Sequence, residues 1–136
     1  MKKIGILFFL LFTGMLLQAQ SIQSSSYSSL GSISSDGKIK NASYQTVGYI
    51  KDDGAVQNKS YSTIGYIKSD GTIQNSSYST VGYVKANGAV QNSSYSTIGY
   101  IKQDGTVQNA SYSTIGYAKG VKKEWAALVF FFFKFD

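Results

Sequence analysis

Short segments that alternate apolar and polar residues, separated by Gly, Asn, Asp and Ser, recur along most of the chain. Near the middle, residues 78–85 read Tyr-Ser-Thr-Val-Gly-Tyr-Val-Lys and residues 89–92 read Ala-Val-Gln-Asn. Alternation rich in β-branched and aromatic residues is typical of β-strands. Asn87-Gly88 lies between the two segments, and Asn-Gly between apolar segments is a strong hairpin signal. The pattern therefore predicts a β-hairpin over residues 78–92.

Two registers are open to this hairpin. A two-residue turn would pair Lys85 with Val90, whereas a three-residue loop with Gly88 left-handed would pair Val84 with Val90. We expect the second, because like residues should face each other when one side of a hairpin is buried. One face then carries Tyr78, Thr80, Gly82, Val84 and Val90, and the other carries Ser79, Val81, Tyr83, Lys85, Ala89 and Gln91. Neither face is purely polar, so we expect both to be partly covered.

The hairpin is one copy of a 17-residue repeat, Tyr-Ser-Thr-Ile-Gly-Tyr-Ile-Lys-x-Asp-Gly-Thr-Val-Gln-Asn-x-Ser. Five units fill residues 27–111, and residues 112–119 begin a sixth. The first unit departs from the others, because Ser32 replaces the second Tyr and Lys40 replaces Gln.

A single hairpin is marginally stable in water, so the units must pack against each other. Closure removes exposed strand edges, and the extra half-unit favours it by pairing with the first unit. We therefore predict an all-β fold, a closed radial array of five β-hairpins with pseudo-fivefold symmetry.

The N-terminus has the pattern of a secretory signal peptide. Met1-Lys2-Lys3 precedes an apolar segment over residues 4–17, and Ala19 and Gln20 are the expected cleavage positions. This apolar segment is short for a retained membrane helix, which is the alternative. The chain has no Cys, so it cannot carry a lipoprotein anchor. We expect a signal peptide at 1–20, a repeat domain at 21–119, and export to the periplasm, the cell surface or the extracellular space.

The repeat ends at Gly120, and residues 120–136 form an apolar segment that runs from Trp125-Ala126-Ala127 into a series of Phe residues. Its periodicity does not distinguish helix from strand. We expect an apolar helix or plug that fills or caps the ring. The alternatives are a docking surface, an outer-membrane strand, or membrane contact through Phe130, Phe131, Phe132 and Phe133. We favour burial, because exposing such a patch is costly.

Composition excludes several classes of function. The 136 residues include no Cys, His or Pro, which removes disulfides, Cys or His metal ligands, Cys nucleophiles and His-based triads. Loss of Lys2 and Lys3 would leave 11 of the 13 basic residues against 7 acidic ones, a net charge of +4. The lysines are evenly spaced, without the basic patch of a nucleic-acid binder. We predict no enzyme, no catalytic residues, no metal, no cofactor and no nucleic-acid partner.

The acidic and Asn residues of the repeat are better explained as turn residues than as catalytic groups, metal ligands or glycosylation sites. Asp or Asn precedes each loop glycine. Asn-x-Ser, which matches a glycosylation sequon, occurs five times, but the 17-residue repeat turns one match into five automatically. Such residues stabilise turns by bonding to nearby backbone. We assign both sets to turns: Asp36, Asp53, Asp70, Asn87 and Asp104, and Asn41, Asn58, Asn75, Asn92 and Asn109.

The second Tyr of each unit is the candidate ligand-binding residue. These tyrosines lie beside Lys and Gln on one predicted face, and aromatic and amide groups together can stack on and hydrogen-bond a sugar or peptide. Equivalent weak sites would gain affinity by multivalency. The alternative is that the rings pack between units, with each hydroxyl bonded to a partner. The candidates are Tyr49, Tyr66, Tyr83, Tyr100 and Tyr117.

The repeat and its flanks resemble a known family. Tandem Ser-Tyr-Ser-Thr-Ile-Gly-Tyr-Ile-Lys-x-Asp-Gly-Thr-Val-Gln-Asn units, an export signal before them and Ala-Ala followed by Phe residues at 126–133 are similar to the exported bacterial 5-fold β-flower proteins. The resemblance covers residues 21–136. It implies five β-hairpins arranged radially around a pseudo-fivefold axis, and it implies no activity.

These observations predict an exported non-catalytic structural or binding module of unknown ligand and partner, with a glycan or a cell-envelope component as candidates. One alternative is a secreted fibre-forming matrix subunit, since Gln-Asn pairs, Tyr, Gly and the absence of Pro also suit cross-β layers. The other is a carbohydrate- or peptidoglycan-binding protein that uses the repeated Tyr residues.

Overall fold

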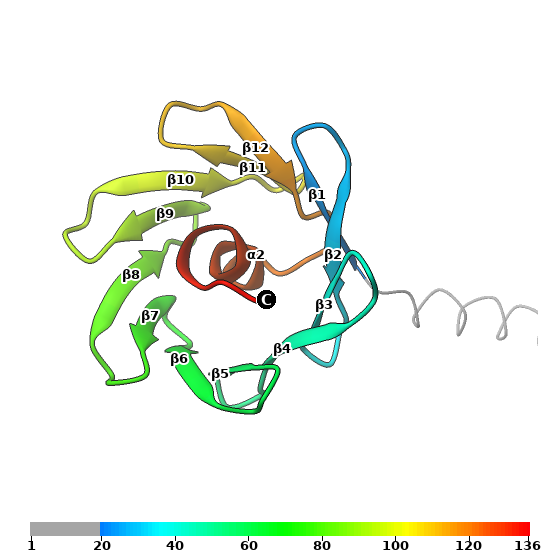
Figure 1. Ribbon diagram of the computed structural model, residues 1–136. Helices are drawn as coiled ribbons and strands as arrows, with labels where there is room; N and C mark the ends of the chain where they lie inside the picture. Colours follow the sequence, from blue (N-terminus) through cyan, green and yellow to red (C-terminus); the bar gives the residue numbers. More distant parts are fainter. Residues whose placement is uncertain (1–19) are drawn as a thin grey trace, which may run out of the picture.

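The protein is a closed antiparallel β-barrel of twelve strands with one short C-terminal helix (Figure 1). The computed structural model describes residues 20–136, so the predicted signal peptide lies outside the described residues except for Gln20, which begins the first strand. The strands are β1 (Gln20–Ser24), β2 (Ser29–Ile33), β3 (Lys38–Asn41), β4 (Thr46–Ile50), β5 (Ala55–Asn58), β6 (Thr63–Ile67), β7 (Thr72–Asn75), β8 (Thr80–Val84), β9 (Ala89–Asn92), β10 (Thr97–Ile101), β11 (Thr106–Asn109) and β12 (Thr114–Tyr117).

Each strand pairs with its neighbours in sequence, and β1 closes the barrel on β12. At this closure Gln23 lies opposite Tyr117, as Gln108 lies opposite Tyr100 between β11 and β10. Closure was predicted, but through the first unit; the structure uses residues 20–24, which precede that unit. Ser21-Ile22-Gln23-Ser24 carries the apolar-Gln pattern of Ala89-Val90-Gln91-Asn92, which explains the matching register.

The predicted hairpin register is confirmed. Val84 lies opposite Val90 and Tyr83 lies opposite Gln91. The Lys85 amide donates to the Ala89 carbonyl at 2.8 Å. The three-residue loop places Gly88 at a φ of 93°, a conformation that glycine adopts without strain.

The prediction for the start of each repeat was wrong. Tyr78 was expected in a strand, but β8 begins at Thr80, and Tyr78 lies in a turn with a φ of 66°. The ladder between β7 and β8 shifts between Gly82 and Thr80, leaving Val81 as the extra residue of a β-bulge. A bulge breaks strict alternation. Val81 therefore packs against the core instead of sharing the outer face of Tyr83.

The C-terminal segment, residues 121–136, lies at the centre of the ring of strands (Figure 1). It forms α2 (Lys123–Ala127), which continues into the π-helical turn η1 (Leu128–Phe132), so the segment is helical where helix and strand were both open. The core lies between this helix and the barrel wall. Its fully buried side chains include Ile33, Val56, Ile73, Val90, Val107 and Leu128.

Five Phe rings of the C-terminal segment face glycines of the barrel wall. An added Cβ at Gly82 would clash with the Phe132 ring and with the Gln91 carbonyl oxygen. The wall therefore lacks side chains where the rings lie. The five contacts are Gly116 with Phe130, Gly99 with Phe131, Gly82 with Phe132, Gly65 with Phe133, and Gly48 with Phe135.

Candidate functional site

Ten of the eleven tyrosines form five stacked pairs, four joining consecutive repeats and one joining the first repeat to the last half-unit at the barrel closure. The ring centroids are 4.6–4.8 Å apart and the ring planes differ by 8–16°. Offset stacking at this distance is favourable for aromatic rings. The pairs are Tyr49–Tyr61, Tyr66–Tyr78, Tyr83–Tyr95, Tyr100–Tyr112 and Tyr117–Tyr27.

The two hydroxyls of each pair are hydrogen-bonded to each other. The O–O distances run from 3.0 to 3.2 Å, with the strand tyrosine as donor. This hydrogen bond is the main reason why the pKa of the donor lies above its ordinary value, and desolvation by burial adds to the shift. The donors are the five predicted candidates: Tyr49, Tyr66, Tyr83, Tyr100 and Tyr117.

The strand supplies the first ring of a pair. Gly82 and Val84 are buried and face the interior, so the intervening Tyr83 projects from the outer face of β8. Gln91 lies opposite Tyr83 on β9. The other pairs have the same neighbour, with Gln57, Gln74 and Gln108 in the repeats and Gln23 at the closure.

The turn supplies the second ring. The Asn92 side-chain oxygen accepts hydrogen bonds from the backbone amides of Ser94 and Ser96 at 2.9 and 3.1 Å. The Tyr95 amide donates to the Asn92 carbonyl at 3.0 Å. This loop holds Tyr95 at a φ of 68°, a left-handed conformation that costs a non-glycine residue about 1–2 kcal/mol. The conformation allows the Tyr95 ring to lie against the Tyr83 ring.

The turn tyrosines are well exposed. Tyr61, Tyr78, Tyr95 and Tyr112 each leave 65–66% of their surface accessible to solvent. One face of each pair is therefore available for contact with another molecule. Their positions repeat with the barrel strands, so five similar aromatic surfaces surround the outer wall.

The first repeat interrupts this belt. Tyr44 has the same left-handed backbone, with a φ of 64°, but it is 84% exposed. The strand position that would supply its partner is Ser32, which lies opposite Lys40 instead of a glutamine. Tyr44 therefore presents a ring without a tyrosine stacked on it.

The Asp and Asn residues before the loop glycines have turn roles. The side-chain oxygens of Asp53, Asn87 and Asp104 each accept the backbone amide two residues later at 3.0 Å. The pKa values of Asp70 and Asp104 lie below the ordinary value, mainly because each carboxylate accepts a hydrogen bond from the backbone amide two residues later. Each carboxylate serves its own loop. Within residues 20–136, no three His, Cys, Asp or Glu side chains gather as metal ligands.

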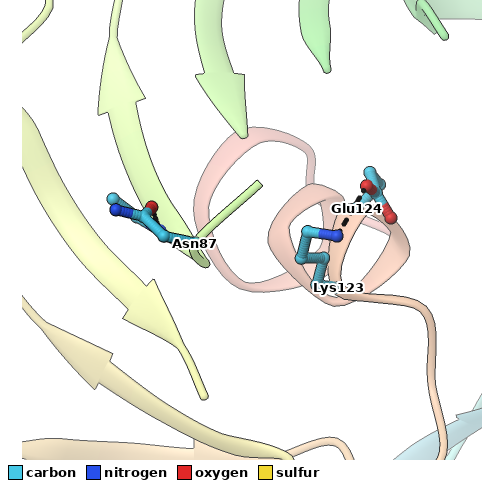
Figure 2. A network of polar contacts seen from close by, with 4 residues as sticks. Asn87, Lys123 and Glu124 are labelled. Carbon is cyan, nitrogen blue, oxygen red and sulfur yellow. Dashed lines mark hydrogen bonds and ion pairs between the residues drawn. The ribbon is translucent and has the colours of Figure 1, made fainter. Parts of the chain in front are cut away.

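The end of the barrel where α2 begins carries a second candidate surface (Figure 2). A cavity of about 450 Å³ there is lined by Asn87, Lys102, Lys122 and Lys123, among others. Lys123 forms an ion pair with Glu124 at 3.3 Å, and Lys122 lies 4.9 Å from the Trp125 ring centre. Two of the three lysines that line the cavity therefore already interact with Glu124 or Trp125. The tyrosine pairs, with their exposed rings, are the stronger candidate site.

The 5-fold beta-flower protein family model matches residues 19–134. The chain belongs to the 5-fold beta-flower protein family. No curated protein and no solved structure matches the chain at a significant level. The family description names an architecture and no ligand, so only the residues of this beta-flower chain indicate what its surface binds.

The five tyrosines predicted as site residues all lie in the pairs of this beta-flower chain, but their partners were not predicted. Those partners are the first tyrosines of each repeat: Tyr27, Tyr61, Tyr78, Tyr95 and Tyr112. A signal was present, because a Tyr follows Asn-x-Ser or its equivalent in every unit, at a loop position where Gly or Asn is usual. No helix among residues 20–136 has the length and apolar character needed to cross a membrane.

Proposed function

We propose that this chain is an exported, non-catalytic binding module that acts in the periplasm, at the cell surface or outside the cell. The signal-peptide pattern at the N-terminus supports the location. The observation that carries the binding role is the belt of five stacked tyrosine pairs, whose exposed rings sit on a strained backbone. Sparsely populated backbone conformations in non-glycine residues cluster at functional sites.

The chemistry of the belt fits a glycan of the cell envelope. A pair offers a flat ring face for the apolar side of a sugar, with two hydroxyls and a neighbouring glutamine amide as hydrogen-bonding groups. Tyr supplies such contact area at a low cost in conformational entropy. A polymer that reaches several pairs would bind with avidity even when each contact is weak.

Two observations support a role without catalysis. The hydrogen bonds within the pairs raise the pKa of the donor hydroxyls, which makes these tyrosines poorer bases and nucleophiles at neutral pH. The carboxylates before the loop glycines bond to their own turns. Neither set has the nucleophile and base arrangement that group transfer requires.

We further propose that the repeats act as five radial hairpins around the C-terminal segment, as the family resemblance implies. Support comes from the five glycine and Phe contacts, which give five wall positions the same packing. Strands β12 and β1 then close the array. The closed ladder leaves no free edge among β1–β12, which argues against a fibre built by strand addition.

The test is binding of purified protein to peptidoglycan and to an array of envelope glycans. Truncation of Tyr66, Tyr83 and Tyr100 to Ala removes three of the five pairs, so we expect apparent affinity to fall about 10²-fold. The matched control replaces the same residues with Phe, which keeps the rings and removes the hydroxyls. Retained binding by the folded Ala variant, or no binding by the wild type, would contradict the proposal.

A further inference from the structure

The end of the barrel opposite the start of α2 contains a cavity of about 650 Å³ with a mixed lining that is more apolar than polar. This volume lies in the range of small-molecule sites, which are mostly apolar and largely preformed. Its polar lining consists of Ser32, Lys40, Asn41, Lys134 and Asp136. The apolar lining includes Ile22, Leu30, Ile39, Val129, Phe133 and Phe135.

The cavity lies at the one strand glycine whose nearest neighbours include no Phe ring. The six glycines at this repeat position are Gly31, Gly48, Gly65, Gly82, Gly99 and Gly116. The last five each face a ring, whereas the three atoms nearest to an added Cβ at Gly31 all belong to the backbone of Lys40 and Asn41. Like the other five glycines, Gly31 places no side chain on the wall, although its φ of 149° distinguishes its backbone from theirs.

The order of the C-terminal segment explains why Gly31 is left over. The four glycines from Gly116 back to Gly65 contact four consecutive Phe residues, 130 to 133 in that order. The glycine of the preceding repeat, Gly48, contacts Phe135. The residues just before and just after this series are Val129 and Asp136, and both border the cavity. A valine is smaller than a phenylalanine and an aspartate is polar, so neither supplies a sixth ring.

We propose that this cavity binds a free, neutral, monocyclic aromatic molecule, whose ring takes the position at Gly31 that Phe rings take at the other five glycines. The Phe133 and Phe135 rings in the lining offer edge-to-face contacts. Removing the ligand's apolar surface from water drives binding. This inference is independent of the tyrosine belt.

The experiment is a titration of the full chain with benzyl alcohol, followed by NMR. We expect intermolecular NOEs from the benzyl ring to methyl groups of Ile22, Ile39 and Val129. Cyclohexylmethanol, which has a similar size without aromaticity, should bind at least tenfold more weakly. NOEs to residues elsewhere, no saturable binding, or equal affinity for the two alcohols would overturn the proposal.

Two variants locate the site. V129F should fill the cavity and weaken benzyl alcohol binding at least tenfold, whereas the matched control V129A should keep binding. Unchanged binding in a folded V129F protein would overturn the assignment; if V129F does not fold, the wild-type NOEs decide. The variant with Tyr66, Tyr83 and Tyr100 changed to Ala should bind benzyl alcohol normally, which separates this site from glycan binding.

Discussion

The first repeat and the later repeats share loops and strand register but differ in both layers of side chains. In the later repeats, a strand tyrosine stacks on a turn tyrosine outside the barrel, and a strand glycine faces a Phe ring inside. In the first repeat, Ser32 leaves Tyr44 without a stacked tyrosine, and Gly31 borders a cavity. The loops and the ladder register are nevertheless the same. Turns and strand pairing therefore set the backbone, and the aromatic layers add to it.

The largest expected effect is in the regular part of the molecule. In G82A, the new Cβ would meet the Phe132 ring and the Gln91 carbonyl oxygen. Overpacking of this kind costs about 1–3 kcal/mol of the free energy of unfolding, which urea denaturation would measure. The double variant G82A/F132A should show a coupling energy between the two sites. A G82A protein as stable as the wild type would mean that the ring does not lie against this glycine.

The second prediction compares Tyr95 with Tyr44. Y95G and Y44G both relieve a left-handed backbone, at φ values of 68° and 64°, so this relief cancels in the comparison. Only Y95G also loses a stacked and hydrogen-bonded partner, Tyr83. Y95G should therefore melt roughly 5 °C below Y44G, as circular dichroism would measure. Equal melting temperatures would show that the pair adds nothing to stability.

The third prediction builds the missing pair. S32Y places a tyrosine at the strand position that precedes Tyr44 by 12 residues, the separation found in Tyr83–Tyr95. We expect a rise of a few °C in melting temperature, measured by calorimetry. S32A is the control, since it changes the residue without adding a ring. A crystal structure of S32Y with the two rings apart would contradict the expected geometry.

The smallest effect is a dependence on alkaline pH. The hydroxyl hydrogen bonds raise the pKa of the five strand tyrosines. Their contribution to stability is therefore fully present below the ordinary tyrosine pKa of about 10, and is lost as pH rises through the raised values. Absorbance titration should show a late-titrating group of tyrosines, reduced when Tyr83 is replaced by Phe. A single transition at the ordinary value would argue against the hydroxyl pairs.

Local signals in the sequence were enough to predict the hairpins. The Asn87-Gly88 loop and the alternation around Val84 and Val90 gave the observed register. The period of 17 residues and the need to cover strand edges predicted closure. The helical form of the C-terminal segment did not follow from its periodicity, because a segment that is apolar on all sides lacks a preferred face.

The candidate site was half predicted, for a physical reason. Tyr83 lies within a strand, where alternation assigns its face, but Tyr95 lies in a loop at a position that usually requires glycine or asparagine. Propensities count a tyrosine as a strand residue, so Tyr78 and its equivalents were placed in strands. The stacking that offsets the strained backbone joins tyrosines from different repeats. It therefore cannot be predicted from the local sequence around either tyrosine.

The pairing of β1 with β12 has a consequence for synthesis. The pair joins residues more than 90 positions apart, such as Gln23 and Tyr117. Until the ribosome has released β12, the growing chain therefore exposes two unpaired strand edges, which are templates for aggregation. The incomplete chain is therefore expected to be more prone to aggregation than the closed barrel.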